Sequence, residues 1–184
     1  MQWMNSTERY GAVSRTLHWL VVALIITQVV LAKTAEGLPN GIEKLATLSQ
    51  HKSIGMLVLM LALARIAWRL FSPGPRAPSG SPAWQRAAAG ASHGLLYLLL
   101  LLQPLTGWLM SSTKNYPVSF FGWFQFPDLV GASEVWHERL EEIHEFLAGT
   151  IIAIAVLHAA AALYHHFVLR DGVLRRMLPG LGRP

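Results

Sequence analysis

The chain has 184 residues, of which 53% are hydrophobic and only 14% are charged, and its mean hydropathy is +0.38. Ordinary soluble domains carry roughly 25% charged residues, so this composition excludes a typical water-soluble globule. The sequence contains no cysteine, which excludes disulfide bonds and cysteine-ligated metal clusters.

Four apolar runs approach the length of about 20 residues that crosses a bilayer as a helix. They predict an all-α fold, a transmembrane four-helix bundle that forms one domain over residues 1–184. The spans are expected at about 15–33, 51–70, 88–110 and 143–169. The first run also fits a cleaved signal peptide, with Val30 and Ala32 as the small residues of a cleavage site. Cleavage would remove His18 and leave an odd number of spans, so we favour a retained helix.

Two connections between the spans have distinct compositions. Segment 71–83 contains four prolines among Gly and Ser, which predicts an extended linker without helix or strand. Segment 111–136 is crowded with aromatic residues, which predicts anchoring at the membrane interface. These aromatic residues are Tyr116, Phe120, Phe121, Trp123, Phe124, Phe126 and Trp136.

Basic residues concentrate on one side of the predicted membrane. Ten of the fifteen are Arg9, Arg15, Arg65, Arg69, Arg76, Arg86, Arg170, Arg175, Arg176 and Arg183, next to both termini and the proline linker. The positive-inside rule therefore predicts that both termini are cytoplasmic. The sequence pI near 10 is explained by this orientation, so no nucleic-acid partner is expected.

Histidines within the spans form two candidate pairs. His144 and His158 are fourteen residues apart, so they share one helix face within about 40° and lie roughly 21 Å apart along the axis. His18, near the cytoplasmic end of the first span, matches His158 in depth, and His51 matches His144 near the outer side. Ionisable groups within a span are candidates for a functional site. Each pair can fill both axial positions of a haem iron through imidazole nitrogens.

The other histidines are weaker candidates. His137 lies among acidic residues and is expected to be solvated, and His165 and His166 are expected to hydrogen-bond at the cytoplasmic interface, with a propionate or quinone contact as the alternative. His93 is the one ionisable residue in the apolar part of the third span. A hydrogen bond to a neighbouring helix is the simplest role for it. The alternative is that His93 contacts a quinone or carries a proton.

Several stretches carry a resemblance to a known family: SRTLHWL, SQHKSIGMLVLMLALARIAWRL, IHEFLAGTIIAIAVLHAAAAL, and HAAAALYHHF followed by DGVLRRMLP. They resemble the bacterial cytochrome b561 family, which is related to the membrane cytochrome b subunits of hydrogenases and formate dehydrogenases. The resemblance covers essentially the whole chain and implies four helices with two b-type haems (heme b).

The resemblance places the axial haem ligands on His18, His51, His144 and His158, which are the residues paired by depth. His137 is a rival for the outer position because some relatives have a Trp-His pair there. The fourteen-residue spacing to His158 favours His144 instead.

An iron with histidine on both faces has no open coordination position, which favours single-electron transfer. The resemblance implies that ubiquinone or another membrane quinone is one terminal, and that some members accept electrons from superoxide on the periplasmic side. We therefore expect an oxidoreductase of the bacterial inner membrane, in contact with lipid and with a redox partner protein as a further candidate. The alternative is an anchor subunit that passes electrons from a hydrogenase or dehydrogenase to quinone.

Overall fold

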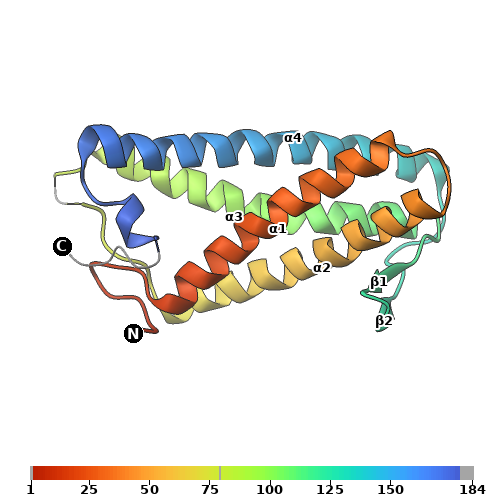
Figure 1. The fold of residues 1–184 in the computed structure, drawn as a ribbon, viewed down its shortest axis with the longest axis horizontal. Helices are drawn as coiled ribbons and strands as arrows, with labels where there is room; N and C mark the ends of the chain where they lie inside the picture. The colour runs from red at the N-terminus through yellow and green to blue at the C-terminus, as the bar shows by residue number, and fades with distance from the viewer. Residues whose placement is uncertain (1, 79, 179–184) are drawn as a thin grey trace.

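The computed structural model describes residues 2–78 and 80–178, and it is dominated by four long helices (Figure 1). They are α1 (Ala12–Gly37), α2 (Ile42–Phe71), α3 (Ala83–Ser112) and α4 (Glu134–Tyr164). Each is long and apolar enough to cross a membrane. The predicted all-α class and the four-helix bundle are therefore confirmed.

The helices extend beyond the apolar runs seen in the sequence. α4 begins at Glu134, well before the expected apolar span, because the side chain of Ser133 accepts a hydrogen bond from the backbone N–H of Trp136 and caps the helix. Hydropathy marks only the part of a helix that suits lipid, whereas the hydrogen-bonded helix continues into polar sequence. After α4 the chain forms a π-helical segment, η1 (His165–Leu169), and later a short 3-10 turn, η2 (Leu174–Arg176).

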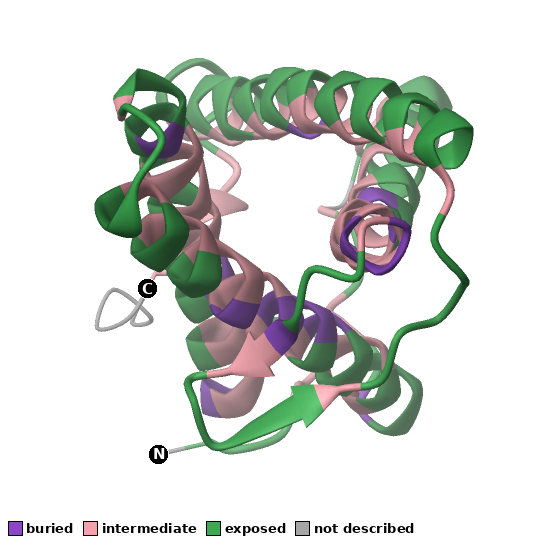
Figure 2. Cartoon of the chain, turned by 90° about the vertical axis from the view of Figure 1, so that its right-hand side faces the viewer, coloured by how far each residue is buried: buried purple, intermediate pink, exposed green. Residues whose placement is uncertain are grey.

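The centre of the bundle is a small apolar core to which all four helices contribute. Its buried members are Val21, Val58, Ala62, Leu99, Leu100 and Ile151. Of the 31 residues of α4, all of them described, only Ile151 is buried, while Phe146 is 73% exposed. The outward faces of the helices are largely exposed and the inward faces are half-buried or buried (Figure 2). Large apolar side chains on the outside of a bundle are typical of a protein surrounded by lipid.

The helix pairs whose backbones pack closely along the described chain are α1 with α2, α2 with α3, and α3 with α4. Viewed end-on, the four helices form a ring (Figure 2). α4 therefore approaches α1 and α2 mainly through side chains that point into the bundle.

One end of the bundle, which we call the termini end, gathers the segments before α1 and after α4. The backbone N–H of Ala12 donates to the carbonyl of Gln2 at 2.8 Å, and the indole N–H of Trp19 donates to the carbonyl of Met177 at 2.9 Å. Arg183, one of the basic residues assigned to this side from the sequence, lies outside the described residues.

The opposite end, which we call the hairpin end, carries two strands that the sequence analysis did not predict. β1 (Val118–Phe120) pairs with β2 (Phe124–Phe126) in antiparallel register. The connecting turn has positive φ at Phe121 (51°) and at Gly122 (78°), which suits the twist of a tight hairpin. Val118 is buried against Met56 and Leu59 of α2.

A hydroxyl of α2 fixes this hairpin to the bundle. Ser53 is buried, donates to the carbonyl of Ser119 at 2.7 Å and accepts from the N–H of Phe121 at 3.1 Å. A single side chain therefore satisfies one backbone acceptor and one backbone donor of the hairpin.

Replacing Ser53 by alanine is expected to loosen the hairpin, because both backbone groups lose their partner at a cost of about 1–3 kcal/mol. Faster proteolysis within segment 117–127 in detergent would report this. Thr47→Ala is the matched control, since the Thr47 hydroxyl donates to the carbonyl of Glu43 in its own helix. Equal protease sensitivity in the two variants would contradict the anchoring role.

Candidate functional site

The hairpin-end pair consists of His51 on α2 and His144 on α4. The centroids of the two imidazole rings are 6.4 Å apart and the ring planes are inclined by 75°. Both side chains are half-buried and come from helices that are not among the closely packed pairs. The structure thus brings together the two histidines that the sequence paired by depth.

The termini-end pair consists of His18 on α1 and His158 on α4. Its ring centroids are also 6.4 Å apart, with an interplanar angle of 64°. Both pairs therefore have the same spacing at two levels of one continuous helix.

His93 on α3 joins the termini-end pair. Its ring centroid lies 5.2 Å from that of His158, with the planes inclined by 62°. Two imidazole–metal bonds of about 2 Å, with the rings themselves added, require roughly 6 Å between centroids. The distance between His18 and His158 meets this requirement, and the shorter distance between His93 and His158 does not.

Polar side chains of α3 surround His144. The hydroxyl oxygen of Thr106 lies 3.1 Å from Nδ1 of His144, and the amide nitrogen of Gln103 lies 3.1 Å from Nε2. A Cβ atom added at Gly107 would lie 3.0 Å from Cε1 of His144, a tighter contact than Cβ atoms usually make, so the ring would have to shift. None of these three residues was predicted from the sequence to belong to the site.

Three buried polar atoms at the hairpin-end pair have no hydrogen-bond partner among the described residues: Oε1 of Gln28, Nδ1 of His51 and Oε1 of Gln103. Gln28 also donates its amide N–H to the carbonyl of His51 at 2.8 Å. Unsatisfied buried polar groups are rare, and their concentration here is what a site built for a ligand shows.

A half-buried cation distinguishes the termini-end pair. The guanidinium of Arg65 lies with Nη2 3.3 Å from Nδ1 of His18, and its carbon lies 5.4 Å from the ring centroid of Tyr97. Arginine only donates hydrogen bonds, so this contact presents positive charge to the ring of His18.

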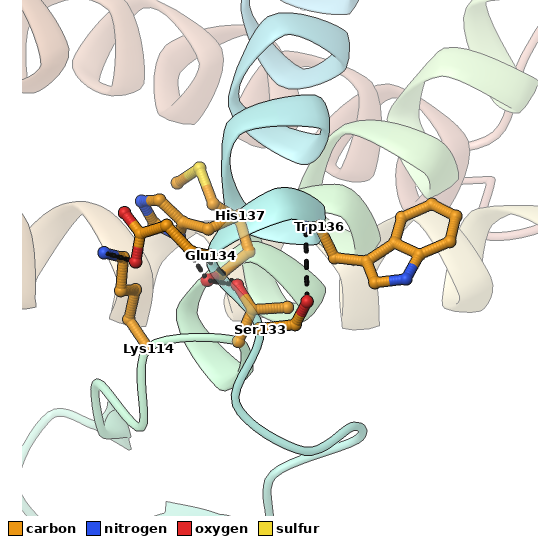
Figure 3. Close-up of polar contacts among 7 residues, drawn as sticks. Lys114, Ser133, Glu134, Trp136 and His137 are labelled. Carbon is orange, nitrogen blue, oxygen red and sulfur yellow. Dashed lines mark hydrogen bonds and ion pairs between the residues drawn. The ribbon is translucent and has the colours of Figure 1, made fainter.

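His137, which was expected to be solvated, is half-buried and hydrogen-bonded, so that expectation is wrong. Its Nδ1 lies 3.1 Å from the carbonyl of Met110 and 3.2 Å from the hydroxyl of Thr113. An ion pair between Lys114 and Glu134 lies beside it (Figure 3) and raises the pKa of Lys114. The sequence showed the acidic neighbours of His137 and could not show the α3 residues that approach it from the side.

The two remaining histidines lie at the termini end. His165 bonds to the carboxylate of Asp171, in line with the interfacial hydrogen bonding expected for it. His166 lines a surface cavity of about 250 Å³ together with Phe167, Arg170, Gly172 and Arg175.

The residues present fit a haem held by two imidazoles at each level. The 6.4 Å ring spacing leaves room for one metal ion between the members of a pair, the partnerless polar atoms gather at one of them, and neutral imidazole nitrogens suit iron. Without cysteine, attachment of haem through thioether bonds is excluded.

Gly107→Ala is expected to lower the haem content of the purified protein, because the added methyl group forces the ring of His144 out of line with His51. Gly94→Ala is the matched control on α3, since a Cβ atom there meets nothing within 4 Å. Haem absorbance per chain measures both variants. An unchanged haem content in Gly107→Ala would show that the close contact with His144 is not needed.

Comparison with known proteins agrees with the four-helix membrane architecture. The sequence profile of the prokaryotic cytochrome b561 family matches residues 9–180. The chain is 36% identical over 182 residues to cytochrome b561 homolog 2 of Escherichia coli (strain K12), which covers 97% of this chain and 95% of that protein. It is 30% identical over 173 residues to the probable superoxide oxidase CybB of Yersinia pestis (94% and 97% covered) and 28% identical over 180 residues to cytochrome b562 of Cereibacter sphaeroides (95% and 98% covered).

Members of this family bind b-type haem, typically two per chain, and are multi-pass proteins of the bacterial inner membrane. The chain therefore belongs to the prokaryotic cytochrome b561 family, the membrane cytochromes b that transfer electrons.

Proposed function

We propose that this chain holds two b-type haems, one between His18 and His158 and one between His51 and His144, and carries single electrons from one side of the membrane to the other. The observation that carries the proposal is the pair of equal 6.4 Å ring spacings at two levels of α4. When bound, the haems supply one-electron oxidation and reduction.

The histidines have two tasks in this proposal. They hold the iron from both faces, so no open position remains where oxygen or a substrate binds the metal. The apolar core between the two levels, which includes Val21 and Ile151, excludes water from the space between the sites. The protein thus favours electron transfer over ligand chemistry.

The proposed orientation places the termini end in the cytoplasm and the hairpin end in the periplasm. It is supported by the positive-inside rule, because ten of the fifteen basic residues lie in or next to the proline linker and the two terminal segments.

The periplasmic electron donor is proposed to be superoxide, since one relative is named a probable superoxide oxidase. The other five basic residues lie on the hairpin side: Lys33, Lys44, Lys52, Lys114 and Arg139. Three of them are neutralised in ion pairs, namely Lys33 with Glu36, Lys114 with Glu134 and Arg139 with Glu142. Lys52, next to His51, makes no ion pair among the described residues and instead bonds to the carbonyl of Pro117 at 3.3 Å. Its uncompensated charge would attract an anion to this level of the bundle.

The electron acceptor is proposed to be ubiquinone or another membrane quinone, with His93 as the residue that contacts it. The support is the position of His93, half-buried and 5.2 Å from the ring of His158 without the spacing of a ligand pair. An anchor subunit for a larger dehydrogenase or hydrogenase would use the same four histidines. Recovery of a stable complex with such an enzyme from native membranes would favour that alternative.

Single histidine variants should separate the two sites. His51→Ala or His144→Ala is expected to remove the hairpin-end haem and leave the other, and His18→Ala or His158→Ala should do the reverse, because each change empties one axial position of one iron. Haem per chain should fall from two equivalents to about one, as each pair holds one iron. Redox titration should then show one surviving midpoint potential, which differs between the two classes.

His137→Ala is the control for the hairpin-end assignment and His93→Ala for the termini-end assignment, and both should keep two haems. The assignment of His144 would be wrong if His137→Ala removed a haem while His144→Ala retained it.

His93→Ala should also slow the oxidation of reduced protein by a soluble quinone analogue, because the quinone loses its proposed polar contact. The measurement is the rate of quinone reduction per reduced haem in the presence of superoxide or another external one-electron donor. If His93 only supports the packing of α3, the variant will be less stable but its rate per haem will equal that of the wild type, and the quinone contact must be sought elsewhere.

A further inference from the structure

Thr106 occupies a defined place between its own helix and His144. Its hydroxyl donates to the backbone carbonyl of Gln103 at 2.9 Å, a bond between residues three apart within α3. The same oxygen lies 3.1 Å from Nδ1 of His144. Thr106 itself is buried, so water does not compete for these contacts.

The donors and acceptors around His144 define its tautomer. The amide nitrogen of Gln103 only donates, so Nε2 of His144 accepts from it at 3.1 Å. The proton of the neutral ring then lies on Nδ1, and it is donated to the hydroxyl oxygen of Thr106, whose own proton goes to the carbonyl of Gln103.

The same arrangement recurs seven residues away along both antiparallel helices. Thr113 donates to the carbonyl of Met110 at 2.7 Å, and its oxygen lies 3.2 Å from Nδ1 of His137. His137 has no other histidine ring packed against it within residues 2–78 and 80–178, whereas His144 faces His51. The chain therefore contains two similar threonine–histidine contacts, only one of which belongs to a histidine pair.

We propose that Thr106 is a positioning residue for haem at the hairpin end: it fixes His144 as the Nδ1–H tautomer, which leaves the Nε2 lone pair for the iron once the amide of Gln103, its donor in this structure, is displaced. This rests on the proposed assignment of His144 as a ligand. A metal-bound imidazole that donates its second N–H to an acceptor is held in orientation and becomes a more basic ligand. A more basic ligand stabilises the oxidised iron, so the Thr106 contact lowers the midpoint potential of the hairpin-end haem.

Thr106→Val tests the proposal, because valine has nearly the shape of threonine and lacks the acceptor oxygen. In the full-length protein with both haems, we expect a positive shift of one midpoint potential and a changed low-spin electron paramagnetic resonance signal for the same haem. The other haem should be unaffected. Thr106→Ser should restore both signals toward the wild type, since serine returns the hydroxyl.

Thr113→Val is the matched control, since it removes the same contact from His137 and should leave both potentials unchanged. If Thr106→Val loses the hairpin-end haem and Thr106→Ser retains it, the hydroxyl is again shown to be needed. The proposal is overturned if Thr106→Val leaves both signals unchanged, or if Thr106→Ser behaves like Thr106→Val.

The ligand assignment of His144 and the role of Thr106 can be disproved separately. His144→Ala with both haems retained would remove the ligand assignment itself. His144→Ala with one haem lost, together with a silent Thr106→Val, would keep the ligand and remove only the role of Thr106.

Discussion

Imidazole rings inside an apolar bundle are the constraint on which the rest of this structure depends. A buried polar group without a partner costs about 1–3 kcal/mol, so each ring has to be paired or to bind a ligand. The two pairs span from α4 to α1 and from α4 to α2, and the closely packed helix pairs are different ones. The width of two rings therefore sets the distance of α4 from α1 and from α2. Helix α3 completes the bundle by packing against both α2 and α4.

The surroundings of the two pairs differ in charge. At the hairpin end, His144 is contacted by a hydroxyl and an amide, which are neutral. At the termini end, His18 is contacted by the guanidinium of Arg65, which carries a full positive charge at all relevant pH values. A nearby cation favours the reduced state of a redox centre, because reduction adds negative charge. In the proposed function these two environments give the two haems unequal midpoint potentials, and the haem at the termini end is the more easily reduced.

Much of the fold could be predicted from the sequence because lipid imposes length and apolar composition on each helix. The depth pairing of His18 with His158 and of His51 with His144 was also accessible, since positions along a helix follow from residue number. The ring distances agree with that pairing, while the role of these residues as haem ligands stays a prediction.

What the sequence could not supply depends on rotation and on loop geometry. Whether Thr106 or Gly107 faces His144 depends on how α3 is turned about its axis, and no pattern in an evenly apolar helix shows that. The hairpin at Val118–Phe126 was missed because its aromatic residues also suit a plain interfacial loop. His137 was judged from its acidic neighbours on α4, but the contacts that decide its state come from Met110 and Thr113 on α3.

The uninterrupted course of α4 has a consequence for energetics in a living cell. His144 and His158 lie on one helix roughly 21 Å apart along its axis, which is about two-thirds of a hydrocarbon layer of about 30 Å. Moving one charge across the full membrane potential involves about 2.3 kcal/mol per 100 mV, so a transfer between these levels involves about 1.5 kcal/mol per 100 mV. With the proposed orientation, an electron travelling toward the negative cytoplasm moves against this field. The step is electrogenic. A membrane potential therefore makes this electron transfer less favourable, and loss of the potential makes it more favourable.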